Sequence, residues 1–225
     1  MNIFPGILLS ALLACAFSAQ AGVVVGGTRL IYDGGKKESS LSVSNPDKYP
    51  FLVQSWVETA NGDSEKAPFM VTPPLFRLDG GQTNVLRIVR AGGSLPADKE
   101  SLFWMNIKAI PSAEKTQNQN TLQIAVKTRI KLIYRPQGLK GVPEEQTEKL
   151  VWQRQGNRVM ATNPTPFYMN FMEINVAGKP LQDVTYVAPG SSATFALPAG
   201  VSSGTLSWKI ISDYGGIGSE HHHTL

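Results

Sequence analysis

Apolar and polar residues alternate most regularly in residues 121–136, TLQIAVKTRIKLIYRP. The apolar positions of one face are Leu122, Ile124, Val126, Ile130 and Leu132. The cations of the opposite face are Lys127, Arg129 and Lys131. This period of two predicts an extended strand of roughly 40 Å, at about 3.3 Å per residue. Such a strand either fills the middle of a sandwich, where its alternation serves only the core, or lends its apolar side chains to another protein.

Short β-rich runs separated by turn residues precede this strand, and none keeps a helical period. They are residues 23–32, 39–44, 49–58, 69–72, 75–78, 82–90 and 101–110. About seven strands at this spacing predict an antiparallel sandwich of immunoglobulin-like size. Pro73 and Pro74 separate two of the runs, which is consistent with an edge strand or with a strand that changes sheets.

A Pro- and Gly-rich stretch, residues 136–143, has the composition of a linker. After it come shorter β-rich runs at residues 159–162, 167–176, 184–187, 193–197 and 206–212. The pattern therefore predicts an all-β chain with two domains, residues 22–135 and 144–225, each long enough to bury its own core.

Residues 1–21 carry an apolar run at residues 7–14 and end in Ala19-Gln20-Ala21, which predicts a cleaved secretory signal. The mature chain then begins at Gly22 and contains no cysteine, so disulfides do not stabilise it. The alternative is a lipoprotein signal in which Cys15 is acylated.

Composition and charge exclude several functional classes. The net charge is +4, but the basic residues are scattered among acidic ones, so we expect no nucleic-acid surface and a mild preference for acidic partners. All three histidines lie at His221–His223, in a tail that we expect to be disordered, so no histidine is placed for Ser-His-Asp or Cys-His catalysis. No glycine-rich phosphate loop or metal-ligand spacing occurs; we expect no cofactor or metal and no enzymatic activity. A carboxylate pair drawn from Glu58, Asp79, Glu100 and Asp213 stays open.

Residues 95–111, LPADKESLFWMNIKAIP, resemble the signature segment of the periplasmic chaperones of the chaperone–usher pilus pathway. Other segments resemble the same family in the same order: GTRLIYDG, VTPPLFRL, IKLIYRP, NPTPFYMNF and SDYGG. The resemblance extends over essentially the whole mature chain. It implies two immunoglobulin-like domains arranged as an L or boomerang, and a periplasmic chaperone that caps pilus subunits by donor-strand complementation and delivers them to an outer-membrane usher.

The resemblance also implies roles for particular residues. Arg29 and Lys131 match the pair that anchors the subunit's C-terminal carboxylate. Leu122, Ile124 and Val126 match the side chains inserted into the subunit, and Glu100, Arg135 and Asp213 match the charges that link the domains. Lys131 has the opposite parity to the inserted side chains, which a twist or a bulge between Val126 and Lys131 would reconcile.

Alternatives stay open at several points. The chain could be a β-sandwich pilus subunit or a glycan-binding adhesin, and the free chaperone could cap its own strand in a homodimer. Lys131 could lie on a solvated surface, while Trp104, Tyr134 and Trp208 are expected in the cores. Residues 217–225 are short, polar and free of cysteine where the family usually adds a strand, so the second domain is expected to have an open edge or to lack its last strand.

Overall fold

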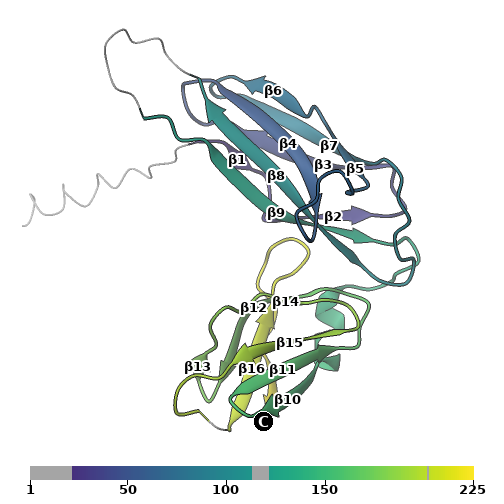
Figure 1. The fold of residues 1–225 in the computed structure, drawn as a ribbon, viewed down its shortest axis with the longest axis vertical. Helices are drawn as coiled ribbons and strands as arrows, with labels where there is room; N and C mark the ends of the chain where they lie inside the picture. The colour runs from purple at the N-terminus through teal and green to yellow at the C-terminus, as the bar shows by residue number, and fades with distance from the viewer. Residues whose placement is uncertain (1–21, 113–121, 202) are drawn as a thin grey trace, which may run out of the picture.

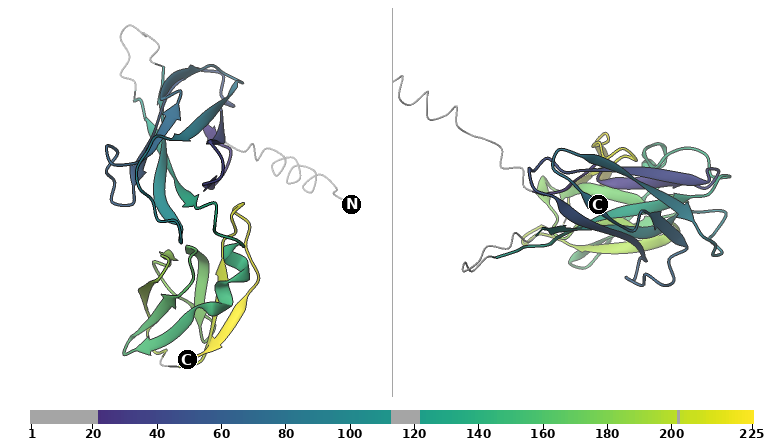
Figure 2. Two further views of the ribbon diagram at one scale, coloured as in Figure 1. Left: turned by 90° about the vertical axis from the view of Figure 1, so that its right-hand side faces the viewer. Right: turned by 90° about the horizontal axis from the view of Figure 1, so that it is seen from above.

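The structure is a computed structural model that describes residues 22–112, 122–201 and 203–225. The predicted signal segment, residues 1–21, lies outside this part. The described chain forms two β-sandwich domains stacked end to end (Figures 1 and 2). The predicted class, two immunoglobulin-like sandwiches, is confirmed.

The first domain consists of two facing sheets. One has the order β1-β3-β7-β5 and comprises β1 (Val24–Val25), β3 (Glu38–Ser44), β7 (Thr83–Arg90) and β5 (Phe69–Thr72). The other has the order β2-β9-β8-β4-β6 and comprises β2 (Arg29–Asp33), β9 (Val126–Arg135), β8 (Ser101–Pro111), β4 (Phe51–Thr59) and β6 (Leu75–Leu78). Alternate residues of both sheets, including Leu86, Ile88, Ile130 and Leu132, fill the space between them.

Two segments of this domain change sheets. The run predicted at residues 23–32 is divided at Gly26, so that β1 joins one sheet and β2 the other. The chain passes from one sheet to the other at this glycine. A side chain would not fit here, because a Cβ atom at Gly26 would collide with the Ser42 hydroxyl. At Pro73 and Pro74 the chain crosses again, because β5 pairs with β7 and β6 pairs with β4. The strand change predicted from the two prolines is therefore confirmed.

The long strand is shorter than predicted. It begins at Val126, and residues 122–125 belong to no strand. The pairing of β8 with β9 ends at Ala109 and Val126, so the preceding residues have no neighbouring strand to bind. They leave the sheet at the end of the first domain that points away from the second (Figure 1). The expected 40 Å strand is wrong because alternation sets the faces of a strand but does not supply its partners.

The second domain follows two short 3-10 helices, η1 (Pro143–Glu145) and η2 (Thr147–Lys149). Its smaller sheet contains β10 (Val151–Gln155), β11 (Arg158–Asn163) and β15 (Ser191–Ala196). Its larger sheet contains β13 (Lys179–Pro180), β12 (Met169–Val176), β16 (Thr205–Ile210) and β17 (His221–Thr224), and β14 (Tyr186–Val187) pairs with β12. Trp152 packs against Phe171 and Trp208 in a separate core.

The histidine tail forms a strand, which corrects two expectations. Strand β17 pairs with β16, so the second domain has its last strand and the tail is part of the fold. The His221 ring stacks on Trp208 with 5.6 Å between ring centroids, and its Nδ1 lies 3.4 Å from Glu148 Oε1. Strand β17 is the last strand of its sheet, so one of its backbone edges has no neighbouring strand in the described sheet, and polar residues are typical of such an edge.

Candidate functional site

Arg29 and Lys131 lie side by side where the two domains meet. Strands β2 and β9 run parallel, and their register places Arg29 directly opposite Lys131. Arg29 Nη1 donates a hydrogen bond to the Ile211 carbonyl at 3.1 Å. Lys131 Nζ donates one to Asn170 Oδ1 at 2.6 Å and lies 4.7 Å from the centroid of the Tyr186 ring. Both cations therefore point from the first domain towards the second, and Lys131 does not lie on a solvated surface.

The two cations lack an anion between them. Within the described residues, neither takes part in an ion pair, and Arg29 Nε is buried without a hydrogen-bond partner. Burial and, to a lesser extent, the neighbouring charge of Arg29 together lower the pKa of Lys131 to about 8. Burial also lowers the pKa of Arg29. The charges of Asp213 and Glu144, which lie too far away to form ion pairs with it, raise the pKa and so offset part of this effect. A carboxylate placed here would receive charge-assisted hydrogen bonds from both side chains.

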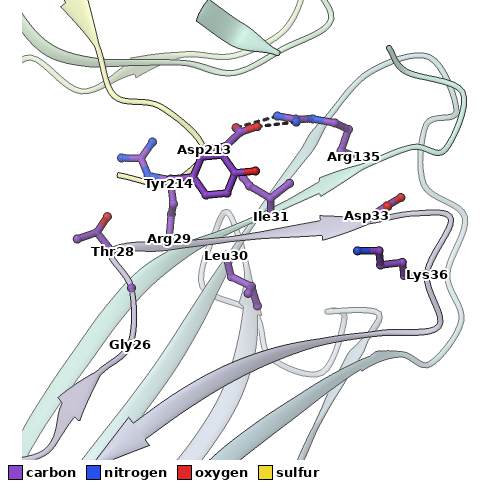
Figure 3. Close-up of a pocket in the computed structure, with 11 residues that line it drawn as sticks. Gly26, Thr28, Arg29, Leu30, Ile31, Asp33, Lys36, Arg135, Asp213 and Tyr214 are labelled. Atoms are coloured by element: carbon purple, nitrogen blue, oxygen red, sulfur yellow. Dashed lines mark hydrogen bonds and ion pairs between the residues drawn. The ribbon is translucent and has the colours of Figure 1, made fainter. Parts of the chain in front are cut away.

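A cavity of about 450 Å³ opens beside Arg29, and Lys131 does not line it. Residues 26–31, Asp33, Lys36, Arg135, Asp213 and Tyr214 line it. Figure 3 shows Arg29 beside the exposed ring of Tyr214, and Tyr214 lies on the segment of the second domain that follows β16. Both domains therefore contribute to the walls of this site.

Arg135 joins the two domains through a buried charge cluster. Its Nη1 and Nη2 lie 2.6 and 2.9 Å from the two carboxylate oxygens of Asp213 (Figure 3). Its Nη2 also lies 2.7 Å from Glu100 Oε1, and the Tyr168 N–H donates to Glu100 Oε2 at 2.7 Å. Burial lowers the pKa of Arg135, but the hydrogen bonds that it donates to Asp213 and the charges of the two carboxylates outweigh burial and raise the pKa. The structure thus brings together the three charges that the sequence singled out.

The exposed part of the long strand carries the three apolar side chains of interest. Leu122, Ile124 and Val126 are 87%, 66% and 54% exposed, whereas Ile130 and Leu132, at the same parity, lie in the core. The apolar face of β9 therefore continues beyond the sandwich into solvent. Contiguous exposed apolar side chains of this kind mark an interaction surface.

The backbone of the same segment is only partly paired. Strand β8 pairs with one edge of β9 from Val126 onward, but β2 pairs with the other edge only from Lys131 onward. Residues 126–130 consequently have one edge without a strand beside it, and residues 122–125 are in no strand. An open edge next to apolar side chains is a template on which another strand pairs.

The parity of Lys131 is also settled by the register. The pairing of β8 with β9 runs without interruption from Val126 to Tyr134, so the predicted alternative of a bulge between Val126 and Lys131 is wrong. Lys131 lies on the face opposite to Val126. Strand β9 therefore presents apolar side chains on one face, and on its opposite face it presents the cation of Lys131 to the second domain.

Several contacts were not foreseen from the sequence. Asn170 and Tyr186, which hold Lys131, come from the second domain and have no signal in the pattern around them. Trp104 was expected in the core but is half-buried on the outer face of the sheet, under Arg129. Residue type alone did not separate the two faces of β8, because both carry large apolar side chains.

Comparison with known families identifies the class. Residues 22–140 match the family described as pili and flagellar-assembly chaperone, PapD N-terminal domain. Residues 145–222 match the pili assembly chaperone PapD, C-terminal domain. The chain belongs to this family of pilus assembly chaperones.

Individual relatives agree with this assignment. The chain is 45% identical to the probable fimbrial chaperone LpfB of Escherichia coli O157:H7, over 94% of this chain and 92% of the relative. It is 43% identical to the chaperone protein FimC of Escherichia coli K12, over 96% and 89%. A chain in the structure of the Salmonella enterica SafA pilin in complex with the SafB chaperone superposes with a TM-score of 0.86 at 42% identity, over 93% of this chain and 99% of that one.

Two other kinds of feature are missing from the part of the chain that the structure describes. No group of three or more His, Cys, Asp or Glu residues there is arranged to hold a metal ion. No helix in that part of the chain is both long enough and apolar enough to cross a membrane.

Proposed function

We propose that this chaperone holds a pilus subunit by adding β9 and the preceding residues to the subunit as a donor strand. Three features carry the proposal. The exposed apolar side chains and the open backbone edge lie on β9 and the residues before it, and the cationic pair without an anion lies where β2 joins β9. Leu122, Ile124 and Val126 would enter the apolar groove of the subunit, and Arg29 with Lys131 would bind its C-terminal carboxylate. The SafA–SafB complex supports the proposal, because it contains a pilin together with a chaperone, and one of its chains is similar to this chain.

The geometry also gives the direction of the subunit strand. Strand β2 occupies the edge of β9 from Lys131 onward, so an added strand pairs with the open edge before that residue. If the C-terminal carboxylate lies at Arg29 and Lys131, the added strand ends at that point. It therefore runs parallel to β9, with its terminus where β2 begins.

The expected energies are sufficient for tight capture. Full burial of an aliphatic side chain contributes about 1.5–3 kcal/mol, and three such side chains are available. Hydrogen bonds to a charged group contribute about 1.5–3 kcal/mol each before the entropy of ordering is subtracted. Because the carboxylate is captured at a single place, it fixes which subunit residues lie opposite the donor side chains.

This function needs no covalent chemistry. We propose that the chain acts without catalysis or ATP, after export to the periplasm behind a cleaved N-terminal signal, and passes its subunit to an outer-membrane usher. Glu100, Arg135 and Asp213 would fix the angle between the domains, because the cluster connects β8 and β9 with the segment after β16. Binding by strand addition would protect the subunit's open groove from aggregation.

Binding of a subunit should weaken as the pH rises above 8. The pKa of Lys131 in the free protein is about 8, so the cation is mostly protonated at pH 7 and mostly neutral at pH 9. A carboxylate binds the protonated form, so the affinity should fall about tenfold between pH 8 and pH 9.5. Titration calorimetry with a purified pilus subunit, in buffers of different ionisation enthalpy, should show proton uptake in this range.

The matched control is Lys131→Arg, which keeps a cation that does not titrate in this range. Its affinity should be nearly constant from pH 7 to pH 9.5. A wild-type affinity that is also constant over this range would contradict the role given to Lys131, and failure to bind any pilus subunit would contradict the proposed function.

A further inference from the structure

A compact cluster of charged and aromatic side chains lies on the outer face of the first domain, behind the donor strand. Lys127 Nζ lies 5.0 Å from the centroid of the Trp56 ring and 3.5 Å from Glu58 Oε1. Arg129 Cζ lies 4.3 Å from the centroid of the Trp104 ring, and its Nη2 lies 3.4 Å from Glu58 Oε2. Trp56 Nε1 donates to Glu58 Oε1 at 2.8 Å. We call Trp56, Glu58, Trp104, Lys127 and Arg129 the latch.

The latch spans three strands. Strand β8 lies between β9 and β4, so Lys127 and Arg129 must extend across β8 to reach Glu58 on β4. Asn106 on β8 lies opposite both Trp56 and Arg129 and is fully buried, although it is on the outer face of the sheet. The latch side chains therefore form a closed layer over the middle of the sheet.

Glu58 is the centre of this layer. Its side chain is only 14% exposed, against 43% and 40% for Lys127 and Arg129. Burial raises the pKa of its carboxyl, but the hydrogen bond from Trp56 and the two cations outweigh this and lower it. The carboxylate is thus charged at neutral pH and holds both cations at once.

The position of the latch along β9 relates it to the donor segment. Lys127 and Arg129 lie within residues 126–130, the stretch that β2 leaves open. They project from the face opposite to Val126. This stretch is paired on one edge only, so its attachments to the domain are the pairing with β8, the buried side chain of Ile130 and these two cations.

We infer that Glu58 is a positioning residue for the donor strand: through Lys127 and Arg129 it fixes the rotation of β9 about its axis, so that Val126 and the apolar residues before it face the incoming subunit. The inference rests on the proposed donor-strand function. If the orientation of β9 is fixed before binding, less entropy is lost when the subunit strand pairs with it. Association should therefore be faster than it would be without the latch.

Other interpretations of the latch differ in what they predict. If its cations bound acidic side chains of the subunit, removal of Glu58 would release them and speed association. If the latch were only structural, its loss would lower the melting temperature of the free protein without a selective effect on association. The rings of Trp56 and Trp104 are already covered by cations, which argues against an open binding platform.

The test is Glu58→Gln, which keeps the size of the side chain and an oxygen that accepts the Trp56 hydrogen bond but removes the charge. We expect association with a purified pilus subunit to slow about three- to tenfold, as for the loss of two partly exposed ion pairs. Amide exchange at residues 126–130 of the free protein should accelerate by a similar factor, while the melting temperature stays close to that of the wild type. Stopped-flow mixing and hydrogen-exchange mass spectrometry measure these quantities.

The matched control is Glu173→Gln, which removes a carboxylate 2.8 Å from Lys209 on the second domain. It should change neither the association rate nor the exchange at residues 126–130. Unchanged or faster association in Glu58→Gln, with normal binding by the wild type, would overturn the inference. If the wild type bound no subunit, the donor-strand function itself would fail.

Discussion

Replacing Ile124 by aspartate should weaken subunit binding by roughly 150- to 5,000-fold. Ile124 is 66% exposed in the free protein, so Ile124→Asp should leave its fold and melting temperature unchanged. In the complex the new carboxylate would enter an apolar groove without a partner, and an uncompensated buried charge costs about 3–5 kcal/mol. Surface plasmon resonance with an immobilised pilus subunit, alongside thermal unfolding of the variant, measures both effects.

The neighbouring position provides the control. Gln123 has the opposite parity and is exposed, so Gln123→Asp adds the same charge on the other face of the segment. Its affinity should stay within a few-fold of the wild type. Equal losses at positions 123 and 124 would show that the segment does not bind as an alternating strand.

Removing Arg29 or Lys131 should weaken subunit binding roughly 10- to 100-fold. Arg29→Ala and Lys131→Ala each delete hydrogen bonds to the carboxylate that are worth about 1.5–3 kcal/mol. Neither side chain has an ion-pair partner among the described residues, so the free protein loses only the contact of Arg29 with Ile211, or those of Lys131 with Asn170 and Tyr186. The affinities follow from the same binding measurement.

A subunit with an amidated C-terminus tests whether Arg29 and Lys131 bind the subunit's carboxylate. The amidated subunit should bind the wild type about as weakly as the intact subunit binds Arg29→Ala. Combining the amidated subunit with Arg29→Ala should weaken binding little further, because both changes remove the same contact between the carboxylate and the arginine. Arg77→Ala, at an exposed cation of the first domain, is the control and should bind normally. Full additivity of Arg29→Ala with amidation would place the carboxylate elsewhere.

The sequence predicted the fold class because alternation and turn residues are local signals. The two domains, the change of sheets at Pro73 and Pro74 and the alternating face of β9 could all be inferred from nearby residues. The pairing of Arg29 with Lys131 and the cluster around Arg135 came from the resemblance to a family. The residues in each group are far apart in sequence, and no local pattern brings them together.

The parts that could not be predicted depend on the partners a segment finds in space. Strand β9 starts at Val126 because β8 ends its pairing there, which the composition of residues 121–125 does not reveal. The His221–Thr224 tail forms a strand because β16 offers it an open edge. Trp104 lies outside the core because Arg129 and Glu58 cover the outer face of its sheet.

The most direct test of the account is amide hydrogen exchange in the chaperone alone and in its 1:1 complex with a pilus subunit. Residues 122–130 have backbone groups without a strand partner, so their exchange should slow strongly in the complex as the subunit strand pairs with them. Residues 131–134, already paired on both edges by β2 and β8, should change little. Protection confined to another surface, with residues 122–130 still exchanging as in the free protein, would contradict donor-strand binding.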